Sequence, residues 1–552
     1  MVSAELVFTG GAVFRPSDQP AKQTRPATTV AVCGGRITAV GDESIRDLAD
    51  PRTEVVDMQG KLLVPGFQDA HVHPVQGGLE RLSCDLSGLD SAADYLAAVG
   101  EYAGSHRSVP WITGGGWMLA AFPQGLPHRN TLDAVVNDRP VSLVNRDHHG
   151  AWVNSRALEL AGVTADTPDP VDGRIERSGN GQPTGVLHEG AMDLVNSHIP
   201  PASPADYVAA LLEAQRYLHS LGITAWQDAI LGSYANIVDA SAAYLSCVES
   251  RQLTARVVGA LWWDRSRGVE QIHELVERRA GLLQRGFRAT SVKIMQDGIA
   301  ENFTAAMTQP YLDGHGHPTN NTGLSMVDPD TLSAAVVALD RLGFQVHVHA
   351  IGDRAVRDSL DAFQAALFAN GPGNNRHHIA HIQVIDPADV GRFAELDVSA
   401  NMQALWAIHE PQMDDLTIPF LGPQRSGWQY PFASLQRSGA RLVAGSDWPV
   451  TSPNPLWAAH VAVNRRLPPA AGGVGEPFMP EQALDVTAAL SAYTSGSAFV
   501  NHLDDTGRIE VGASADLAVL DRDIVAGPTA EIGEATVLAT YVEGRAVYRA
   551  DR

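Results

Sequence analysis

Eight short apolar segments, separated by amphipathic stretches, constrain the fold of this 552-residue chain more than any other feature. Alternation of buried strands with helices is typical of α/β folds, in which helices cover a sheet of parallel strands. The strand candidates begin at residues 66, 223, 255, 291, 345, 378, 398 and 441. The amphipathic stretches between them include residues 207–220, 269–284 and 329–342. Eight such units predict a (β/α)₈ TIM barrel, and no Gly-X-Gly-X-X-Gly motif follows a strand to favour an open doubly wound sheet.

Short alternating strands with glycine turns occur again at both ends of the chain. They cover residues 5–13, 29–39, 54–58, 515–521 and 535–548. Such runs, bounded by turn residues, are typical of half-buried β-strands. We therefore predict one β-sandwich domain built from both termini, with residues 1–64 as its first part and 501–552 as its second.

The first and second barrel strands lie too far apart for one strand–helix unit. Such a unit needs only about 30 residues, so roughly 120 residues are inserted after the first strand. We predict barrel strand 1 at 65–74, an α/β insertion at 75–205 and the remainder of the barrel at 206–500. Barrel active sites lie at the carboxyl ends of the strands, so the insertion is expected to roof the active site.

Charge and cysteine content narrow the choice of partners. The chain has 40 Lys and Arg against 63 Asp and Glu, a net charge of −23 that disfavours nucleic acid and anionic lipid. It contains no uninterrupted apolar run of about 18 residues and no secretory signal at its start. Three scattered cysteines favour a reducing compartment. We expect a cytoplasmic enzyme with a small-molecule substrate and without nucleic-acid or membrane partners. The sequence leaves the oligomeric state open, a homodimer included.

Histidines and an aspartate stand at the ends of the predicted strands. His71 and His73 end the first strand, and alternate residues of a strand point to the same side. One such pair is common by chance, but His349, His381 and Asp447 stand at the ends of other strands. Imidazole and carboxylate groups gathered at one rim of a barrel predict a site for a divalent metal ion.

Two of these positions have a competitor nearby. His347 precedes His349 and His378 precedes His381, so a small error of register would exchange them. We favour His349 and His381 because each lies nearer the carboxyl end of its strand. Lys293 lies inside an apolar strand, where an amine is costly unless it is modified or paired.

Four motifs carry a resemblance to a known family. They are Pro65-Gly-Phe-Gln-Asp-Ala-His-Val-His73, Asn145-Arg-Asp-His-His-Gly-Ala-Trp-Val-Asn-Ser155, His349-Ala-Ile-Gly-Asp-Arg-Ala355 and Gly445-Ser-Asp-Trp-Pro449. Over nearly its whole length the chain resembles the amidohydrolase superfamily, and more narrowly the amidohydrolase-3 group, which includes N-substituted formamide deformylases. The resemblance implies that His71, His73 and Asp447 bind the more buried metal, and that His349 and His381 bind a second. Lys293 matches a lysine that bridges two metals once CO₂ has carboxylated it.

The resemblance also implies a reaction. One or two zinc ions per subunit would activate a hydroxide and polarise the substrate carbonyl. Asp447 would accept the hydroxide proton and pass it to the leaving nitrogen. Asp447 and Lys293 are therefore the catalytic candidates, and an unmodified Lys293 would favour one metal over two. We expect hydrolysis of a non-peptide C–N bond in an amide or formamide. An ester, carbamate or cyclic amide as substrate, or a metal-binding barrel without activity, are the alternatives.

Five residues outside this ligand set are candidates for substrate binding. They are Trp117, Asp147, His149, His188 and Asp297. For Asp147 and His149 a solvated loop is the competing interpretation, and for Trp117 a place in the core is favoured. Residues 298 onward form a long stretch after the fourth strand, which is typical of a binding loop.

Overall fold

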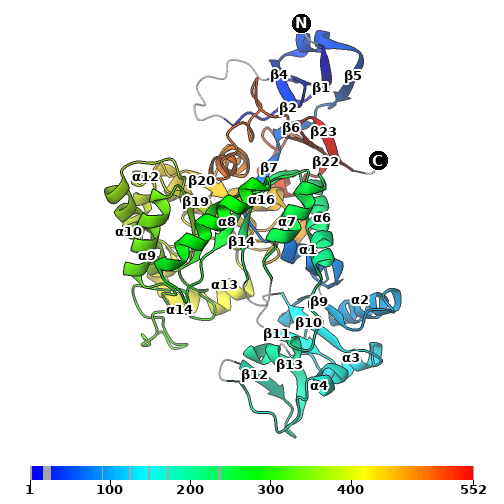
Figure 1. Cartoon of the computed structure of the whole chain (residues 1–552), viewed down its shortest axis with the longest axis vertical. Coiled ribbons are helices and arrows are strands. Elements are labelled where there is room, and N and C mark those ends of the chain that lie inside the picture. Colours follow the sequence, from blue (N-terminus) through cyan, green and yellow to red (C-terminus); the bar gives the residue numbers. More distant parts are fainter. Residues whose placement is uncertain are drawn as a thin grey trace. The chain divides into compact units, whose positions relative to one another are not determined.

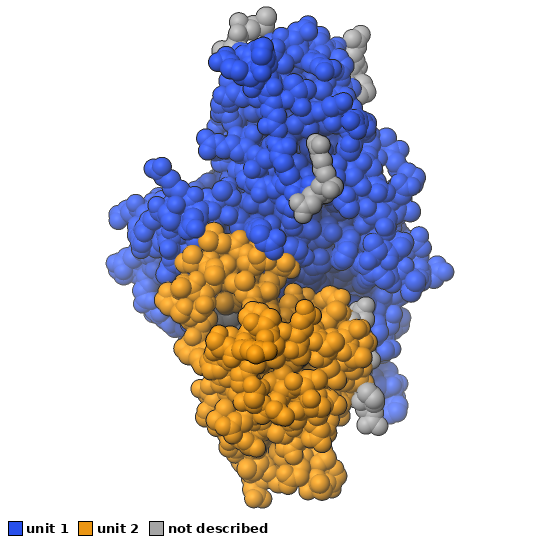
Figure 2. All heavy atoms as spheres, turned by 90° about the vertical axis from the view of Figure 1, so that its right-hand side faces the viewer, with its two compact units in different colours: residues 1–73, 215–552 blue, residues 74–214 orange. Residues whose placement is uncertain are grey.

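The computed structural model of the chain (Figure 1) describes residues 3–16, 27–89, 91–122, 126–146, 150–170, 173–233 and 238–550. Their contacts divide the chain into two compact units, which Figure 2 shows in different colours. The first unit combines Met1–His73 with Gln215–Arg552 and holds the barrel and the β-sandwich. The second unit, Pro74–Ala214, is the chain between the first two barrel strands.

Within the described residues, eight parallel strands form the barrel sheet, each hydrogen-bonded to the next in chain order. They are β7 (Phe67–Val72), β14 (Ile223–Leu231), β15 (Arg256–Trp262), β16 (Arg288–Met295), β17 (Gln345–Ala350), β18 (His378–His381), β19 (Ser399–Met402) and β20 (Leu442–Ala444). Parallel strands are covered on both faces, which explains their continuous buried runs. The predicted TIM barrel is confirmed.

The first and last strands of the barrel meet at their carboxyl ends. The N–H of Asp447 donates to the carbonyl oxygen of His71 at 2.8 Å. The N–H of His73 donates to the carbonyl oxygen of Trp448 at 2.9 Å. These two bonds bring the segments that follow β7 and β20 side by side.

Helices follow most of the barrel strands, and α9 shows why they form where they do. Asp328 caps α9 by accepting hydrogen bonds from the N–H groups of Asp330 and Thr331, and Pro329 occupies the first turn. One face of α9, made of Leu332, Ala335, Val336 and Leu339, is buried, which is the spacing of an amphipathic helix.

The helices of this region are α6 (Pro204–Ser220), α7 (Ser241–Glu249), α8 (Ile272–Gln284), α9 (Pro329–Arg341), α10 (Asp353–Asn370), α11 (Pro387–Val390), α12 (Arg392–Glu395), α13 (Pro411–Leu416), α14 (Ile418–Ser426), α15 (Phe432–Arg437), α16 (Pro455–Asn464), α17 (Val486–Ser491) and α18 (Ser497–Val500). Across the part of the chain that the structure describes, no helix is long and apolar enough to cross a membrane.

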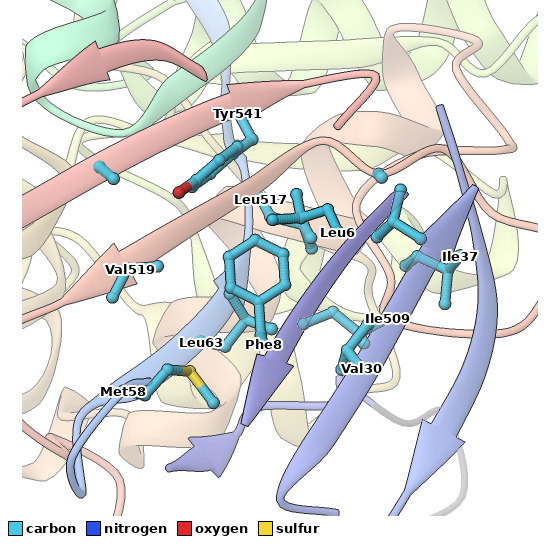
Figure 3. Close-up of a cluster of buried hydrophobic side chains, with 13 residues drawn as sticks. Leu6, Phe8, Val30, Ile37, Met58, Leu63, Ile509, Leu517, Val519 and Tyr541 are labelled. Carbon is cyan, nitrogen blue, oxygen red and sulfur yellow. The ribbon is translucent and has the colours of Figure 1, made fainter. Parts of the chain in front are cut away.

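Both ends of the chain contribute strands to the β-sandwich. Its sheets have the orders β4-β3-β1-β5 and β2-β6-β21-β22-β23. The strands are β1 (Ala4–Thr9), β2 (Ala12–Val13), β3 (Thr29–Cys33), β4 (Arg36–Gly41), β5 (Ala49–Asp57), β6 (Leu62–Pro65), β21 (Leu517–Leu520), β22 (Val537–Val542) and β23 (Arg545–Arg549). Figure 3 shows their shared core, in which Phe8 meets Tyr541 edge to face at 5.1 Å between ring centroids. The predicted sandwich from both termini is confirmed.

The second unit is an α/β insertion that follows β7. Its sheet has the order β12-β13-β11-β10-β9-β8. The strands are β8 (Cys84–Asp85), β9 (Ile112–Trp117), β10 (Val141–Asn145), β11 (Gly150–Val153), β12 (Gly173–Arg177) and β13 (Pro183–Glu189). The helices are α1 (Pro74–Leu82), α2 (Ala92–Ser105), α3 (Arg129–Val135), α4 (Ser155–Leu160) and α5 (Asp193–Asn196).

Candidate metal centre

Four of the residues expected to bind metal lie at the carboxyl ends of the barrel strands. His71 is in β7, His349 is in β17, and His381 is the last residue of β18. Asp447 follows β20 by three positions. Because the strands are parallel, their carboxyl ends form one rim, which is where barrels carry their active sites.

Three of these side chains form a compact cluster. His71, His381 and Asp447 each offer one ligand atom, and these atoms lie within 4.8 Å of one another. All three residues are buried. The Nε2 atoms of His71 and His73 lie 3.0 Å and 2.9 Å from the same oxygen, Oδ1 of Asp447. One carboxylate oxygen is therefore faced by two imidazole nitrogens.

Backbone contacts hold His71 and Asp447 in place. The buried carboxylate of Asp69 accepts from the N–H of His71 at 2.9 Å and from the N–H of Ser446 at 3.1 Å. Burial raises the pKa of Asp69 to about 7. Gly445 allows the close approach of the two segments, because a Cβ there would lie 2.6 Å from the Cβ of His71. Asp447 itself adopts a positive φ of 56°, an unusual conformation that tends to occur at functional sites.

His381 is held by its neighbours but keeps a ring nitrogen unused. Its ring stacks on Trp406 with 5.1 Å between centroids and an interplanar angle of 3°. The backbone N–H of His381 donates to Oε1 of Gln403 at 2.7 Å, and the φ angle of His381 is 78°. Among the described residues, its buried Nδ1 has no hydrogen-bond partner. Buried polar atoms in proteins are rarely left unpaired, so this nitrogen is available to bind a metal ion.

The structure gives Asp297 a different role from the predicted one. Its carboxylate is fully buried and accepts from the backbone N–H groups of Ala306, Ile351 and Gly352 at 2.8 to 3.0 Å. Oδ1 also lies 3.2 Å from Nδ1 of His349. These donors occupy both oxygens, so Asp297 orients His349 and is not placed to bind substrate directly.

Lys293 lies deeper in the barrel than the rim. It is in β16, its register partner in β17 is His347, and it is buried. Its Nζ is 3.4 Å from Nδ1 of His71 and 3.5 Å from Nε2 of His347. Burial lowers the pKa of Lys293 to about 7, so a large fraction of the amine is uncharged near neutral pH.

The electrostatics of the cluster suit a cation. Burial, followed by the nearby charge of Lys293, lowers the pKa of His71 to about 3, so this imidazole is neutral. Neutral imidazole nitrogens around an ionised carboxylate are the donor set that zinc prefers. The residues present therefore fit a divalent metal ion.

The other substrate-binding candidates fall in the second unit. Trp117 is fully buried in a hydrophobic cluster, and its indole N–H donates to the carbonyl oxygen of Leu143 at 2.8 Å. This packing places Trp117 in the core rather than in a wall that faces substrate. His188 is in β13, with Nε2 at 3.5 Å from Oε2 of Glu176, and its role in substrate binding stays a prediction. Asp147 and His149 lie outside the described residues.

Sequence reasoning missed a group of buried polar residues that hydrogen bonds link to His71. They are Gln227, Gln345, His347, His378, Asn401 and Gln403. The sequence identifies His347 and His378 only as rivals of the metal ligands His349 and His381. The signal that could have found the amides is their position, since Gln227, Gln345 and Asn401 each stand in or at the start of a strand that is buried in the barrel.

A parallel barrel with imidazole and carboxylate groups at the carboxyl ends of its strands defines a class of metal-dependent barrel proteins. Comparison with known families gives the particular one. Residues 54–548 match the model of the amidohydrolase family, and the chain belongs to that family. The expected hydrolase of non-peptide C–N bonds is thereby confirmed at the level of the family.

Relatives and a solved structure match over most of their lengths. The chain is 32% identical over 560 residues to protein LONG AFTER FAR-RED 3 of Arabidopsis thaliana, covering 99% of this chain and 92% of that protein. It is 28% identical over 538 residues to N-substituted formamide deformylase of Arthrobacter pascens, covering 94% of each. A crystal structure of an uncharacterized metal-dependent hydrolase from Pyrococcus furiosus has a TM-score of 0.71 and 25% identity, covering 94% of this chain and 99% of that one.

Proposed function

We propose that this protein hydrolyses the C–N bond of a small N-substituted amide or formamide at a zinc centre of one or two ions. The proposed ligands are His71, His73, His349, His381 and Asp447, with Lys293 as a further ligand after carboxylation. The observation that carries the proposal is the convergence of two imidazole nitrogens on Oδ1 of Asp447, with His381 in the same cluster.

Asp447 and Asp297 have separate proposed roles around that centre. When bound, a zinc ion supplies Lewis acidity that polarises a carbonyl and acidifies water. Asp447 is the proposed general base, and its Oδ2 is the atom assigned to receive a proton from the attacking water and return it to the leaving nitrogen. Asp297 fixes the ring of His349 through the 3.2 Å contact between Oδ1 and Nδ1.

Lys293 is proposed to react with CO₂. Its uncharged Nζ would attack the carbon of CO₂, so that an N–C bond forms while one C=O π bond opens and its electron pair moves to oxygen. The nitrogen then loses a proton to solvent, which gives an anionic carbamate. The lowered pKa of about 7 supports this step, because only the deprotonated amine reacts. Lys293→Ala is expected to lose most of the second metal and most activity, and short carboxylates such as acetate should partly restore both.

The choice of amide or formamide rests on likeness to a named relative. The N-substituted formamide deformylase of Arthrobacter pascens matches this chain along 94% of both lengths. The proposed compartment is the cytoplasm, where the cysteines Cys33, Cys84 and Cys247, all free in the structure, would stay reduced.

A substrate panel tests the proposed function. Zinc-loaded protein is mixed with N-substituted formamides, N-acyl amines, esters, carbamates and cyclic amides, and released formate, acid and amine are quantified. We expect turnover of the formamides or N-acyl amines with equal amounts of acid and amine. Asp447→Asn should abolish it, whereas Asp504→Asn, an exposed carboxylate paired with Arg376, should not.

Two outcomes would contradict the proposal. Turnover of esters, carbamates or cyclic amides alone would assign another bond to the same centre. Protein that retains zinc and hydrolyses none of the panel would be a metal-binding barrel without activity.

A further inference from the structure

A buried layer of amide and imidazole side chains touches His71 inside the barrel. We propose that Gln227, acting through His347, is a positioning residue that keeps the hydrogen of His71 on Nδ1 and so presents the Nε2 lone pair to a metal ion. This inference rests on the proposed metal centre and adds a reason why His71 is ready to bind metal before metal arrives.

The direction of the hydrogen bonds is first set at Gln345. Its Nε2 lies 2.8 Å from the carbonyl oxygen of Arg376 and 2.7 Å from that of Val500. Carbonyl oxygens only accept, so this end of the side chain is the NH₂ group and its Oε1 faces the other way. That Oε1 lies 2.9 Å from Nε2 of Gln227, which therefore donates to it. The opposite end of the Gln227 amide, Oε1, is then an acceptor.

The acceptor oxygen of Gln227 determines which ring nitrogens of His347 and His71 carry hydrogen. Nδ1 of His347 lies 2.8 Å from Oε1 of Gln227, so Nδ1 carries the hydrogen. With Nδ1 as the donor, the other ring nitrogen of His347, Nε2, is the acceptor, and it also faces Nζ of Lys293 at 3.5 Å. Nδ1 of His71 lies 2.8 Å from that Nε2 and must be the donor. The lone pair of His71 is left on Nε2, 3.0 Å from Oδ1 of Asp447, an arrangement that is repulsive until a cation lies between the two atoms.

A second chain of hydrogen bonds begins at another backbone group and gives the same answer. The backbone N–H of His381 donates to Oε1 of Gln403 at 2.7 Å, which identifies this end of the amide as its oxygen. The opposite end, Nε2 of Gln403, therefore donates to Oδ1 of Asn401 at 3.1 Å. Nδ2 of Asn401 then donates to Nδ1 of His378 at 3.1 Å. His378 therefore carries its hydrogen on Nε2, which lies 3.2 Å from the same Oε1 of Gln227. Both chains identify this oxygen as an acceptor.

Lys293 does not reverse this assignment. Its Nζ lies 3.4 Å from Nδ1 of His71 and 3.5 Å from Nε2 of His347, both longer than the 2.8 Å between the two rings. If Lys293 supplied the hydrogen of both rings, two acceptor nitrogens would face each other at that short distance. The direct His71–His347 bond is therefore the one that sets the tautomer.

Zinc affinity is the measurement that tests the proposal. Binding of Zn²⁺ to the full-length protein is followed by competition with a chromophoric chelator. Gln227→Leu removes the acceptor, frees His347 to donate to His71, and should weaken zinc binding about 10- to 100-fold. Gln227→Glu keeps an acceptor oxygen and should bind zinc within about threefold of wild type. Gln68→Leu is the matched control, because the side chain of this buried barrel glutamine, among the described residues, is hydrogen-bonded to Thr506 and Asn501 and to no residue of the layer.

A spectroscopic readout separates positioning from packing. In ¹⁵N spectra of histidine-labelled, metal-free protein, assigned with His71→Gln, His71 should show a protonated Nδ1 in wild type and Gln227→Glu. It should show the other tautomer, or a mixture, in Gln227→Leu. If Gln227→Leu does not fold, the pair His347→Gln and His347→Leu makes the same comparison, with only the former keeping an acceptor for His71.

The outcomes are distinct. Folded Gln227→Leu that binds zinc as tightly as wild type, or that keeps hydrogen on Nδ1 of His71, would overturn the inference and leave the proposed function intact. Equal loss of affinity in Gln68→Leu would also overturn it. Wild-type protein that binds no zinc would overturn the metal centre and this inference together.

Discussion

Asp297 connects the backbone after β17 with a proposed metal ligand. Asp297→Asn would turn an NH₂ group toward the N–H donors that its carboxylate now accepts. We expect a loss of about 2–4 kcal/mol in the free energy of unfolding and about 10- to 100-fold weaker zinc binding. Chemical denaturation and zinc titration measure the two effects.

The matched control for Asp297→Asn is Asp361→Asn. Asp361 forms an exposed ion pair with Arg392, and its side chain is 56% exposed. Such pairs contribute about 0–1 kcal/mol, so both measurements should stay near wild type. Asp297→Asn with unaltered stability and zinc affinity would show that the contact with His349 has no positioning role.

Lys293 makes the stability of the metal-free protein depend on pH. Burial lowers its pKa from 10.5 to about 7 in the folded protein, while the unfolded chain keeps the ordinary value. Between these two values the unfolded chain binds a proton that the folded protein does not. The free energy of unfolding should therefore rise with pH, by up to about 1.4 kcal/mol per unit from this group.

Urea denaturation of metal-free protein between pH 7 and pH 9 measures this slope. Lys293→Met has no amine to titrate, so the difference between wild type and variant should grow in favour of wild type as pH rises. A difference that stays constant across the range would mean that the amine keeps its ordinary pKa.

At the scale of single residues, the positions of the ligand candidates could be predicted from the sequence, but the residues that surround them could not. His71, His73 and Asp447 follow from strand ends, and the structure brings them together. The amides Gln227 and Gln345 give no periodic signal, because their partners come from other strands and from backbone carbonyls far along the chain.

At the scale of elements, buried apolar runs made the barrel strands predictable. β17 and β18 are buried at every residue, which matches their reading as strands with both faces covered. In the second unit, β8 has two residues and β12 is mostly half-buried, so neither has a pattern that sequence alone distinguishes from a turn. Local pattern therefore predicts the barrel better than the insertion.

The contact between the ends of β7 and β20 depends on a glycine. In Gly445→Ala the new Cβ would lie 2.6 Å from Cβ and 2.7 Å from the backbone nitrogen of His71, so the two segments must separate. We expect a loss of about 1–3 kcal/mol in stability, with weaker zinc binding, because His71 and Asp447 move apart. Thermal denaturation and zinc competition are the measurements.

Gly281→Ala is the control for this substitution. Gly281 lies in α8, and a Cβ there would meet nothing within 4 Å. Replacing a helical glycine by alanine stabilises a helix by about 1 kcal/mol, so this variant should be as stable as wild type or more so. If Gly445→Ala keeps wild-type stability and zinc affinity, the segments that follow β7 and β20 can move apart without effect on the site, which would contradict this prediction.

At the scale of the whole molecule, ion pairs of Arg256 with Asp516 and Glu543 join the sandwich to the barrel. Arg256 of β15 donates from Nε to Oδ2 of the buried Asp516 at 2.6 Å. The other oxygen of Asp516 accepts from the N–H of Glu543 at 2.8 Å. Residues from the far end of the chain thereby contact a barrel strand, consistent with both lying in one compact unit.

That residues 75–205 roof the active site and take part in substrate binding stays a prediction from the sequence. Hydrogen–deuterium exchange of zinc-loaded protein, with and without a saturating amide or the amine product, tests this. We expect slower exchange in peptides from residues 74–214 as well as from the barrel rim. Slower exchange confined to the barrel would contradict the proposed role of the insertion.

The central claim is that the histidines and Asp447 at the rim bind a divalent metal. A crystal structure of the zinc-loaded protein, with anomalous data at the zinc edge, tests it most directly. The predicted result is a peak about 2.0–2.2 Å from Nε2 of His71 and from the carboxylate of Asp447. If two ions bind, a second peak should lie beside His349, His381 and a carboxylated Lys293. A structure of loaded protein without a zinc peak within bonding distance of His71 or Asp447 would contradict the account.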